Sequence, residues 1–231
     1  MRDQFLSAAL SVAKDLNRDE PEVAANIGIQ LEHMGLETWS ISVRRRIRDS
    51  MNYIQPKKII QTGAGIGHLT AWLLDYFSTK NIVEKFQVVE EGNRFAVILS
   101  RLQERFSKIN MQVKVGKLSL LAAEHKAWAI TRDGEPPLLE NADVIIVNSS
   151  LKNLADEVRM MLSHLNENGV LLTVEPVPPV GERDEEDPEV VGFNSWMELV
   201  KDTSETHHIA FAPLFGGTIV AWLKKFDMSQ D

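Results

Sequence analysis

A glycine-rich stretch that follows a short apolar run constrains the fold of this chain more than any other feature. Ile59 and Ile60 suit the end of a buried strand, and glycines follow at three alternate positions: Gly63, Gly65 and Gly67. Apolar residues then recur with the spacing of one helix face: Leu69, Trp72, Leu73, Tyr76 and Phe77. A strand, a glycine turn and a helix form a common cradle for nucleotide-like ligands, because the glycines let the backbone approach and the helix start offers unpaired N–H groups.

The spacing of the glycines discriminates between ligands. A dinucleotide-binding turn has a third glycine three residues after the second, and this chain has His68 at that position. The pattern therefore disfavours NAD and similar dinucleotides. A tight turn without a ligand remains the alternative interpretation, because α/β proteins use glycine in many turns.

An acidic pair ends the next predicted strand. Segment 86–90 (FQVVE) is predicted to form that strand, and Glu90 ends it, 23 residues after Gly67. In nucleotide-binding α/β folds, an acidic residue about this far along accepts hydrogen bonds from ribose hydroxyls, which a carboxylate can do for two adjacent groups. Glu91 is the competing candidate, since strand alternation lets only one of the two side chains face the ligand.

The remainder of the chain continues to alternate between strand and helix patterns. Strands are predicted at 111–115, 143–147, 170–175, 209–211 and 218–223, with helices between most of them. One of these helices is predicted to start near Leu151 and to be closed by Asn168-Gly169. A loop with four prolines and the acidic run ERDEED spans 176–188. This order predicts an α/β fold around a largely parallel sheet.

Three helical patterns precede the glycine turn, at 5–16, 21–35 and about 40–54. We expect residues 1–54 to form a helical segment packed on the core, and residues 55–231 to form one ligand-binding domain. The third helix carries a basic cluster: Arg44, Arg45, Arg46 and Arg48. This cluster is either a solvated helix face or a contact to an anionic ligand group or to an acidic segment of the chain.

Composition excludes several classes of function. The net charge of −8 over 231 residues disfavours a general nucleic-acid-binding role. The chain has no cysteine, which excludes disulfides, a thiolate nucleophile and a cysteine-based metal site. Its start is charged and amphipathic rather than like a signal sequence, and no apolar run approaches the roughly 20 residues of a membrane span. We therefore expect a cytoplasmic protein without membrane contact.

The glycine turn, with Gln61 before it, resembles motif I of the class I S-adenosylmethionine-dependent methyltransferases. The resemblance covers about residues 39–224 and is closest to the catechol O-methyltransferase-like small-molecule O-methyltransferases. It implies a Rossmann-like, doubly wound sheet of seven strands with an N-terminal helical segment, S-adenosylmethionine as cofactor, and a small-molecule acceptor. The cofactor-binding residues that it implies are Gln61, Thr62, Gly63, Ala64, Gly65, Gly67, Glu90, Glu91, Lys117, Leu118, Ser119 and Asn148.

The same resemblance bears on catalysis and on metal use. That branch holds one Mg²⁺ with an Asp after the fourth strand and an Asp-Asn pair after the fifth, and this chain has Asn148, Glu175 and Pro176 at the matching positions. Proline has no side-chain ligand and Mg²⁺ favours carboxylate oxygens, so we expect no metal. The branch's catalytic lysine has a counterpart in Lys152, one residue out of register, which a solvated lysine would also explain.

The sequence thus predicts a methyltransferase with Asn148, Glu175 and Lys152 as catalytic candidates. Groups that face the acceptor should lie beyond the carboxyl ends of the strands. The candidates for that role are Trp39, Asn148, Ser149, Glu175 and the loop after it. Two other functions remain open: a non-catalytic S-adenosylmethionine-binding regulatory protein, and an aminopropyltransferase-like enzyme, which would need an acidic pocket for a polyamine. A homodimer also remains open.

Overall fold

A computed structural model describes residues 2–80 and 82–225 of the chain. Helices and strands alternate along most of it. The helices are α1 (Arg2–Ala9), α2 (Glu22–Met34), α3 (Ile41–Ile54), α4 (His68–Ser78), α5 (Asn93–Arg105), α6 (Leu118–Thr131), α7 (Leu151–Leu162) and α8 (Pro188–Thr203). The strands are β1 (Lys58–Thr62), β2 (Lys85–Glu90), β3 (Met111–Val115), β4 (Ala142–Val147), β5 (Leu165–Val174), β6 (His207–Leu214) and β7 (Gly217–Lys224).

The strands form one seven-stranded sheet in the order β3-β2-β1-β4-β5-β7-β6. Strands β1 to β5 pair in parallel, and β7 is antiparallel to both β5 and β6. The predicted Rossmann-like sheet of seven strands is therefore confirmed. The order reverses between β1 and β4, and ligands of such sheets bind beyond the carboxyl ends of the strands at this point.

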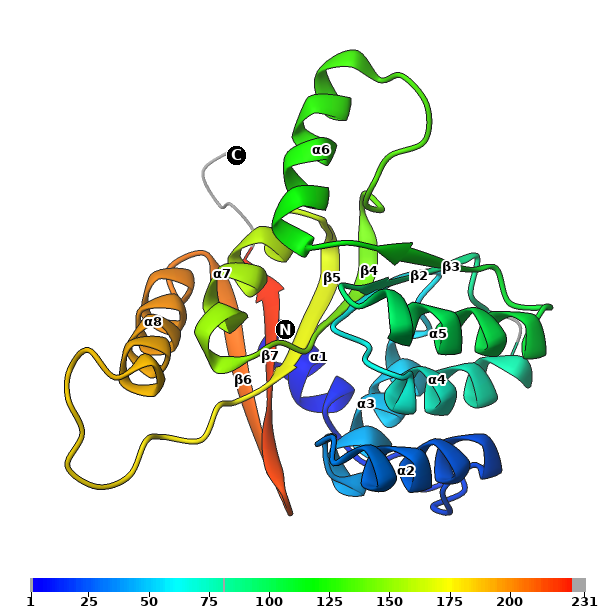
Figure 1. The fold of residues 1–231 in the computed structure, drawn as a ribbon, viewed down its shortest axis with the longest axis horizontal. Coiled ribbons are helices and arrows are strands. Elements are labelled where there is room, and N and C mark those ends of the chain that lie inside the picture. Colours follow the sequence, from blue (N-terminus) through cyan, green and yellow to red (C-terminus); the bar gives the residue numbers. More distant parts are fainter. Residues whose placement is uncertain (1, 81, 226–231) are drawn as a thin grey trace.

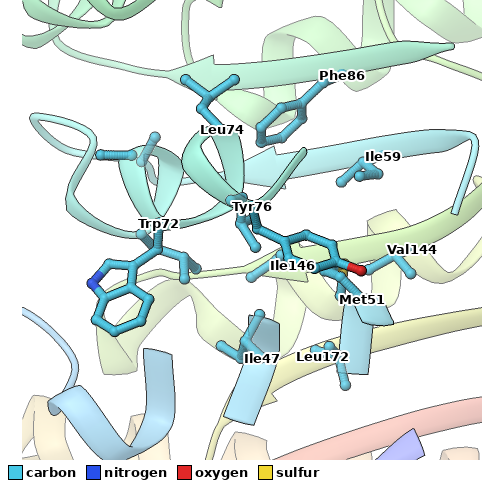
Figure 2. Close-up of a cluster of buried hydrophobic side chains, with 14 of the residues drawn as sticks. Ile47, Met51, Ile59, Trp72, Leu74, Tyr76, Phe86, Val144, Ile146 and Leu172 are labelled. Carbon is cyan, nitrogen blue, oxygen red and sulfur yellow. The ribbon is translucent and has the colours of Figure 1, made fainter. Parts of the chain in front are cut away.

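Helices cover both faces of the sheet (Figure 1). One apolar cluster joins α1 to α5 with one face, and a second joins α6, α7 and α8 with the other. Figure 2 shows part of the first cluster, in which Ile47 and Met51 of α3 and Trp72 of α4 are fully buried. No helix in the described residues is long and apolar enough to cross a membrane.

Two predicted boundaries are wrong. The first helix ends at Ala9, not near residue 16, and the next residues form turns. Strand β5 begins at Leu165, where we expected the end of a helix, because Leu165 pairs with Ala142 of β4. Gly169 lies inside this strand, in an irregular stretch where the pairing with β4 passes from Leu165 to Val170. A Cβ there would be 2.6 Å from the carbonyl oxygen of Ala142, so this close approach requires glycine.

The basic cluster of α3 is not a solvated face. Arg44 and Arg48 are buried, and Arg44 forms an ion pair of 2.8 Å with Glu20, in the segment between α1 and α2. Arg48 pairs with buried Asp49 at 2.9 Å. The alternative, contact with an acidic segment of the chain, is therefore the correct one for Arg44.

Candidate functional site

The three glycines between β1 and α4 all have positive φ angles, of 62°, 56° and 90°. Two of them are required by packing: a Cβ at Gly63 would lie 1.8 Å from the carbonyl oxygen of Asn148, and one at Gly67 would lie 2.6 Å from a methyl carbon of Leu102 in α5. A Cβ at Gly65 would meet no atom within 4 Å. Gly65 is thus the position where the turn leaves its backbone open to a ligand.

Gly65 borders a cavity of about 430 Å³ beyond the carboxyl ends of β1, β2 and β4. The predicted residues that line it are Thr62, Gly63, Gly65, Glu90, Glu91, Leu118 and Asn148. The lining residues that were not predicted to bind the cofactor are Val89, Gly116, Ser149, Ser150, Asn153 and Glu157. Of these, Ser149 was predicted to face the acceptor. We call this space the donor cavity.

Glu90 is the inner member of the acidic pair. Its side chain is buried, and its two oxygens accept hydrogen bonds from the backbone N–H groups of Gly65, at 2.7 Å, and Gly92, at 3.0 Å. Glu91 is exposed and lies 3.6 Å from the ammonium group of Lys117. The geometry therefore favours Glu90 for a fixed ligand contact, and each of its oxygens can accept a further hydrogen bond.

Two further polar side chains lie beside the donor cavity. The hydroxyl of Thr62 has no hydrogen-bond partner among residues 2–80 and 82–225, and it is shielded from solvent, so it does not face the open space of the cavity. Burial raises the pKa of the Glu157 carboxyl; a hydrogen bond from Ser149 opposes this rise, and the charge of Glu91 adds to it.

Glu157 was not predicted because it belongs to no motif. Its position along α7 nevertheless indicates the helix face on which it lies. Ser150 precedes α7, and Asn153 and Glu157 are four residues apart on that helix. Residues at this spacing lie on one face, so all three meet the same cavity. The polar positions of a helix that follows a central strand were therefore the signal available in the sequence.

A second cavity, of about 460 Å³, adjoins the donor cavity and shares Asn148 and Ser149 with it. Its lining brings together the residues predicted to face an acceptor: Trp39, Asn148, Ser149, Glu175, Pro176 and Val177. The residues that the prediction did not name are Glu37, Leu151, Leu154, Thr173, Val174 and Glu189. We call this space the acceptor cavity.

Six predicted site residues lie outside both linings: Gln61, Ala64, Gly67, Lys117, Ser119 and Lys152. The side chain of Gln61 is buried and accepts a hydrogen bond of 3.0 Å from the Thr70 hydroxyl of α4, so it supports the turn from within the core. Any contact of Gln61 with a ligand would therefore be made by its backbone. Lys117 and Lys152 are exposed.

His68, the first residue of α4, also points away from the cavities. It is buried, and its Nε2 lies 3.0 Å from a carboxylate oxygen of Glu20. Burial and the charge of Arg44 lower the pKa of His68, against the opposing influence of Glu20. The same Glu20 oxygen accepts hydrogen bonds from Arg44 and Trp72, so it joins the N-terminal segment to α3 and α4.

The positions that match a magnesium triad, Asn148, Glu175 and Pro176, all line the acceptor cavity. Only Glu175 among them carries a charge. Within the described parts of the chain, no three His, Asp or Glu side chains are arranged to hold a metal ion. The donor set therefore does not fit a cation that prefers several carboxylate oxygens.

Solved structures that share this fold include O-methyltransferases. TomG from Streptomyces achromogenes, an O-methyltransferase involved in tomaymycin synthesis and solved with S-adenosylmethionine, matches with a TM-score of 0.69 and 14% identity, over 90% of this chain and 92% of its own. An O-methyltransferase from Bacillus cereus, solved with S-adenosylhomocysteine, matches with a TM-score of 0.65 and 16% identity, over 96% and 97% of the two chains.

The methyltransferase PaMTH1 from Podospora anserina, bound to S-adenosylhomocysteine, matches with a TM-score of 0.64 and 12% identity, over 97% of this chain and 95% of its own. These structural matches confirm the predicted class I methyltransferase fold. No family model and no curated protein matches the sequence.

Proposed function

We propose that this protein is an S-adenosylmethionine-dependent methyltransferase that acts on a small molecule, at an oxygen atom. The observation that carries the proposal is the pair of adjoining cavities at the point where the strand order reverses. One cavity lies beside Gly65 and Glu90, the other beside Glu175, and Asn148 and Ser149 line both. A methyl donor and an acceptor in these two cavities would meet at the shared residues.

Residues of the donor cavity fit the polar parts of the cofactor. The open backbone at Gly65 allows close approach, and Glu90 has acceptor capacity left for ribose hydroxyls. This fit supports a mononucleoside ligand and agrees with the glycine spacing, which disfavours NAD.

When bound, S-adenosylmethionine supplies a methyl group on a positively charged sulfur. The task of the chain is to hold the acceptor in line with that group and to keep water out, so positioning supplies much of the rate. We assign the positioning of the acceptor to Asn148 and Glu175, which both line the acceptor cavity. Lys152 lies outside both linings, so we give it no direct role.

We propose that transfer needs no metal ion. Pro176 has no side-chain ligand, Asn148 is neutral, and Glu175 alone supplies one carboxylate where Mg²⁺ prefers more. The sequence-based expectations of a cytoplasmic location and of no nucleic-acid partner stay predictions, and a homodimer stays open.

The test is an assay that measures S-adenosylhomocysteine released from S-adenosylmethionine in the presence of a panel of small hydroxyl and amine compounds. Acceptor-dependent release supports the proposal. Cofactor binding without release for any acceptor would favour the regulatory binding protein instead. Transfer of an aminopropyl group from decarboxylated S-adenosylmethionine, with no methyl transfer, would favour the aminopropyltransferase alternative.

A further inference from the structure

We propose that the methyl acceptor is a cation: a small molecule with an apolar or aromatic body and an ammonium group. This inference rests on the proposed function, because it assigns the acceptor to the acceptor cavity. It goes further by naming the charge of a substrate that the fold alone leaves open. The residues that carry it are Glu37, Trp39, Glu175 and Glu189.

The acceptor cavity has charged side chains of one sign only. Its lining contains Glu37, Glu175 and Glu189, and none of its lining residues is Lys, Arg or His. Glu189 is partly neutralised by Arg183, at 2.7 Å. Within the described residues, neither Glu37 nor Glu175 has an ion pair, so both charges remain available to a ligand. An anionic acceptor would be repelled here, and a cationic one attracted.

The rest of the lining is apolar enough to hold a ring or an alkyl body. Trp39 is half-buried, and it stands with Leu151, Leu154, Pro176 and Val177 around the same space. The face of an indole ring attracts an ammonium group in addition to packing against an apolar body. The cavity of about 460 Å³ therefore combines an apolar wall, one aromatic ring and unpaired carboxylates.

The loop between β5 and α8 carries further negative charge. It leaves the sheet after Val174 and arcs outward before α8 begins at Pro188 (Figure 1). It contains the acidic run 182–187, and Glu189 of α8 lines the cavity. That run contains five acidic residues and one Arg. A cleft lined by one sign of charge raises the local concentration of ligands of the opposite sign, and salt weakens this effect.

The experiment measures binding of three matched probes to the protein saturated with S-adenosylhomocysteine. Tyramine, 4-ethylphenol and 4-hydroxyphenylacetate share a phenol ring and differ in charge. We expect tyramine to bind roughly fivefold more tightly than 4-ethylphenol, the effect of one partly exposed charge pair, and 4-hydroxyphenylacetate to bind most weakly. The preference for tyramine should shrink as the salt concentration rises.

Variants then identify the carboxylates responsible. Glu37→Gln and Glu175→Gln should each reduce the preference for tyramine over 4-ethylphenol while leaving S-adenosylhomocysteine binding intact. Glu205→Gln makes the same change of charge at an exposed position outside the cavity and should leave the preference unchanged. Because both measurements are of binding, they do not depend on turnover.

Other results of these binding measurements would contradict either the cationic acceptor or the proposed function. Equal or tighter binding of 4-ethylphenol or 4-hydroxyphenylacetate, or binding of none of the probes, overturns the cationic acceptor. If S-adenosylhomocysteine binds normally in that case, the proposed methyltransferase function stands. If S-adenosylhomocysteine itself does not bind, the proposed function fails, and the inference about the acceptor fails with it.

Discussion

Gly65→Ala should destabilise the protein much less than Gly63→Ala, although the two glycines are two residues apart in one turn. Gly65→Ala adds a methyl group in open space, with no atom within 4 Å. The only loss of stability that we expect comes from the left-handed backbone at φ 56°, a conformation that costs an alanine about 1–2 kcal/mol. For a chain of this size, that free energy corresponds to a fall in Tm of about 2–8 °C.

Gly63→Ala meets a different environment. Its Cβ would lie 1.8 Å from the carbonyl oxygen of Asn148, whereas real Cβ contacts essentially never fall below 3.0 Å. The ends of β1 and β4 would therefore have to separate, which would break the hydrogen bond of 3.2 Å from the Asn148 N–H to the Thr62 carbonyl. We expect a loss of about 3 kcal/mol or more, at the upper end of overpacking effects.

The affinity of Gly65→Ala for the ligand should fall although its stability changes little. The new methyl group of Gly65→Ala occupies the space through which the turn meets the ligand, so affinity for S-adenosylhomocysteine should fall at least about tenfold, or about 1.4 kcal/mol. Thermal unfolding and isothermal titration calorimetry measure the two effects. Normal affinity in folded Gly65→Ala, or equal stability of both variants, would refute the interpretation of the turn.

Further predictions concern the acidic residues and the metal. Glu90→Ala should weaken S-adenosylhomocysteine binding by about 1.5–3 kcal/mol, as expected for hydrogen bonds to a charged group, and Glu91→Ala should change it little; the reverse pattern would mean that Glu91 is the ligand. In thermal-shift assays S-adenosylmethionine should stabilise the protein and NAD should not. Stabilisation by NAD alone would rule out S-adenosylmethionine as the ligand of the donor cavity. Methyl transfer should persist in EDTA, and activity that is lost with EDTA and restored by Mg²⁺ would contradict a metal-free site. The raised pKa of Glu157 means that the folded state binds a proton more tightly than the unfolded state, so stability should fall as pH rises from about 4.5 through that raised pKa. Denaturant unfolding of Glu157→Gln should show this fall removed, and an unchanged pH profile would contradict it.

Local patterns were sufficient to predict the part of the site that lies on one short stretch of chain. The run from Ile59 through Gly65 to the start of α4 specifies a strand, a turn and a helix by itself, and all three occur as expected. The inward orientation of Glu90 was also accessible to prediction, because strand alternation turns only one member of an acidic pair toward the neighbouring turn. Its contact with a ligand stays a prediction. Both predictions depended on residues close together in sequence.

Features that depend on distant partners were not predictable in this way. Arg44 is buried in an ion pair with Glu20 rather than exposed to solvent. Glu20 lies 24 residues earlier and reaches Arg44 only when the N-terminal segment folds against α3. The start of β5 is decided by its pairing with β4, and Asn168-Gly169 belong to an irregular stretch inside this strand rather than to the end of a helix. The acceptor cavity needed Glu37, Glu175 and Glu189 to be brought together from three separate segments.

The central claim is that the donor cavity binds S-adenosylmethionine through the open turn at Gly65 and the carboxylate of Glu90. Isothermal titration calorimetry with S-adenosylhomocysteine on the wild-type protein, Gly65→Ala and Glu90→Ala tests it most directly. We predict saturable binding of one ligand per chain, with lower affinity in both variants while both remain folded by circular dichroism. No binding to the wild-type protein, or binding that neither substitution affects, would contradict it.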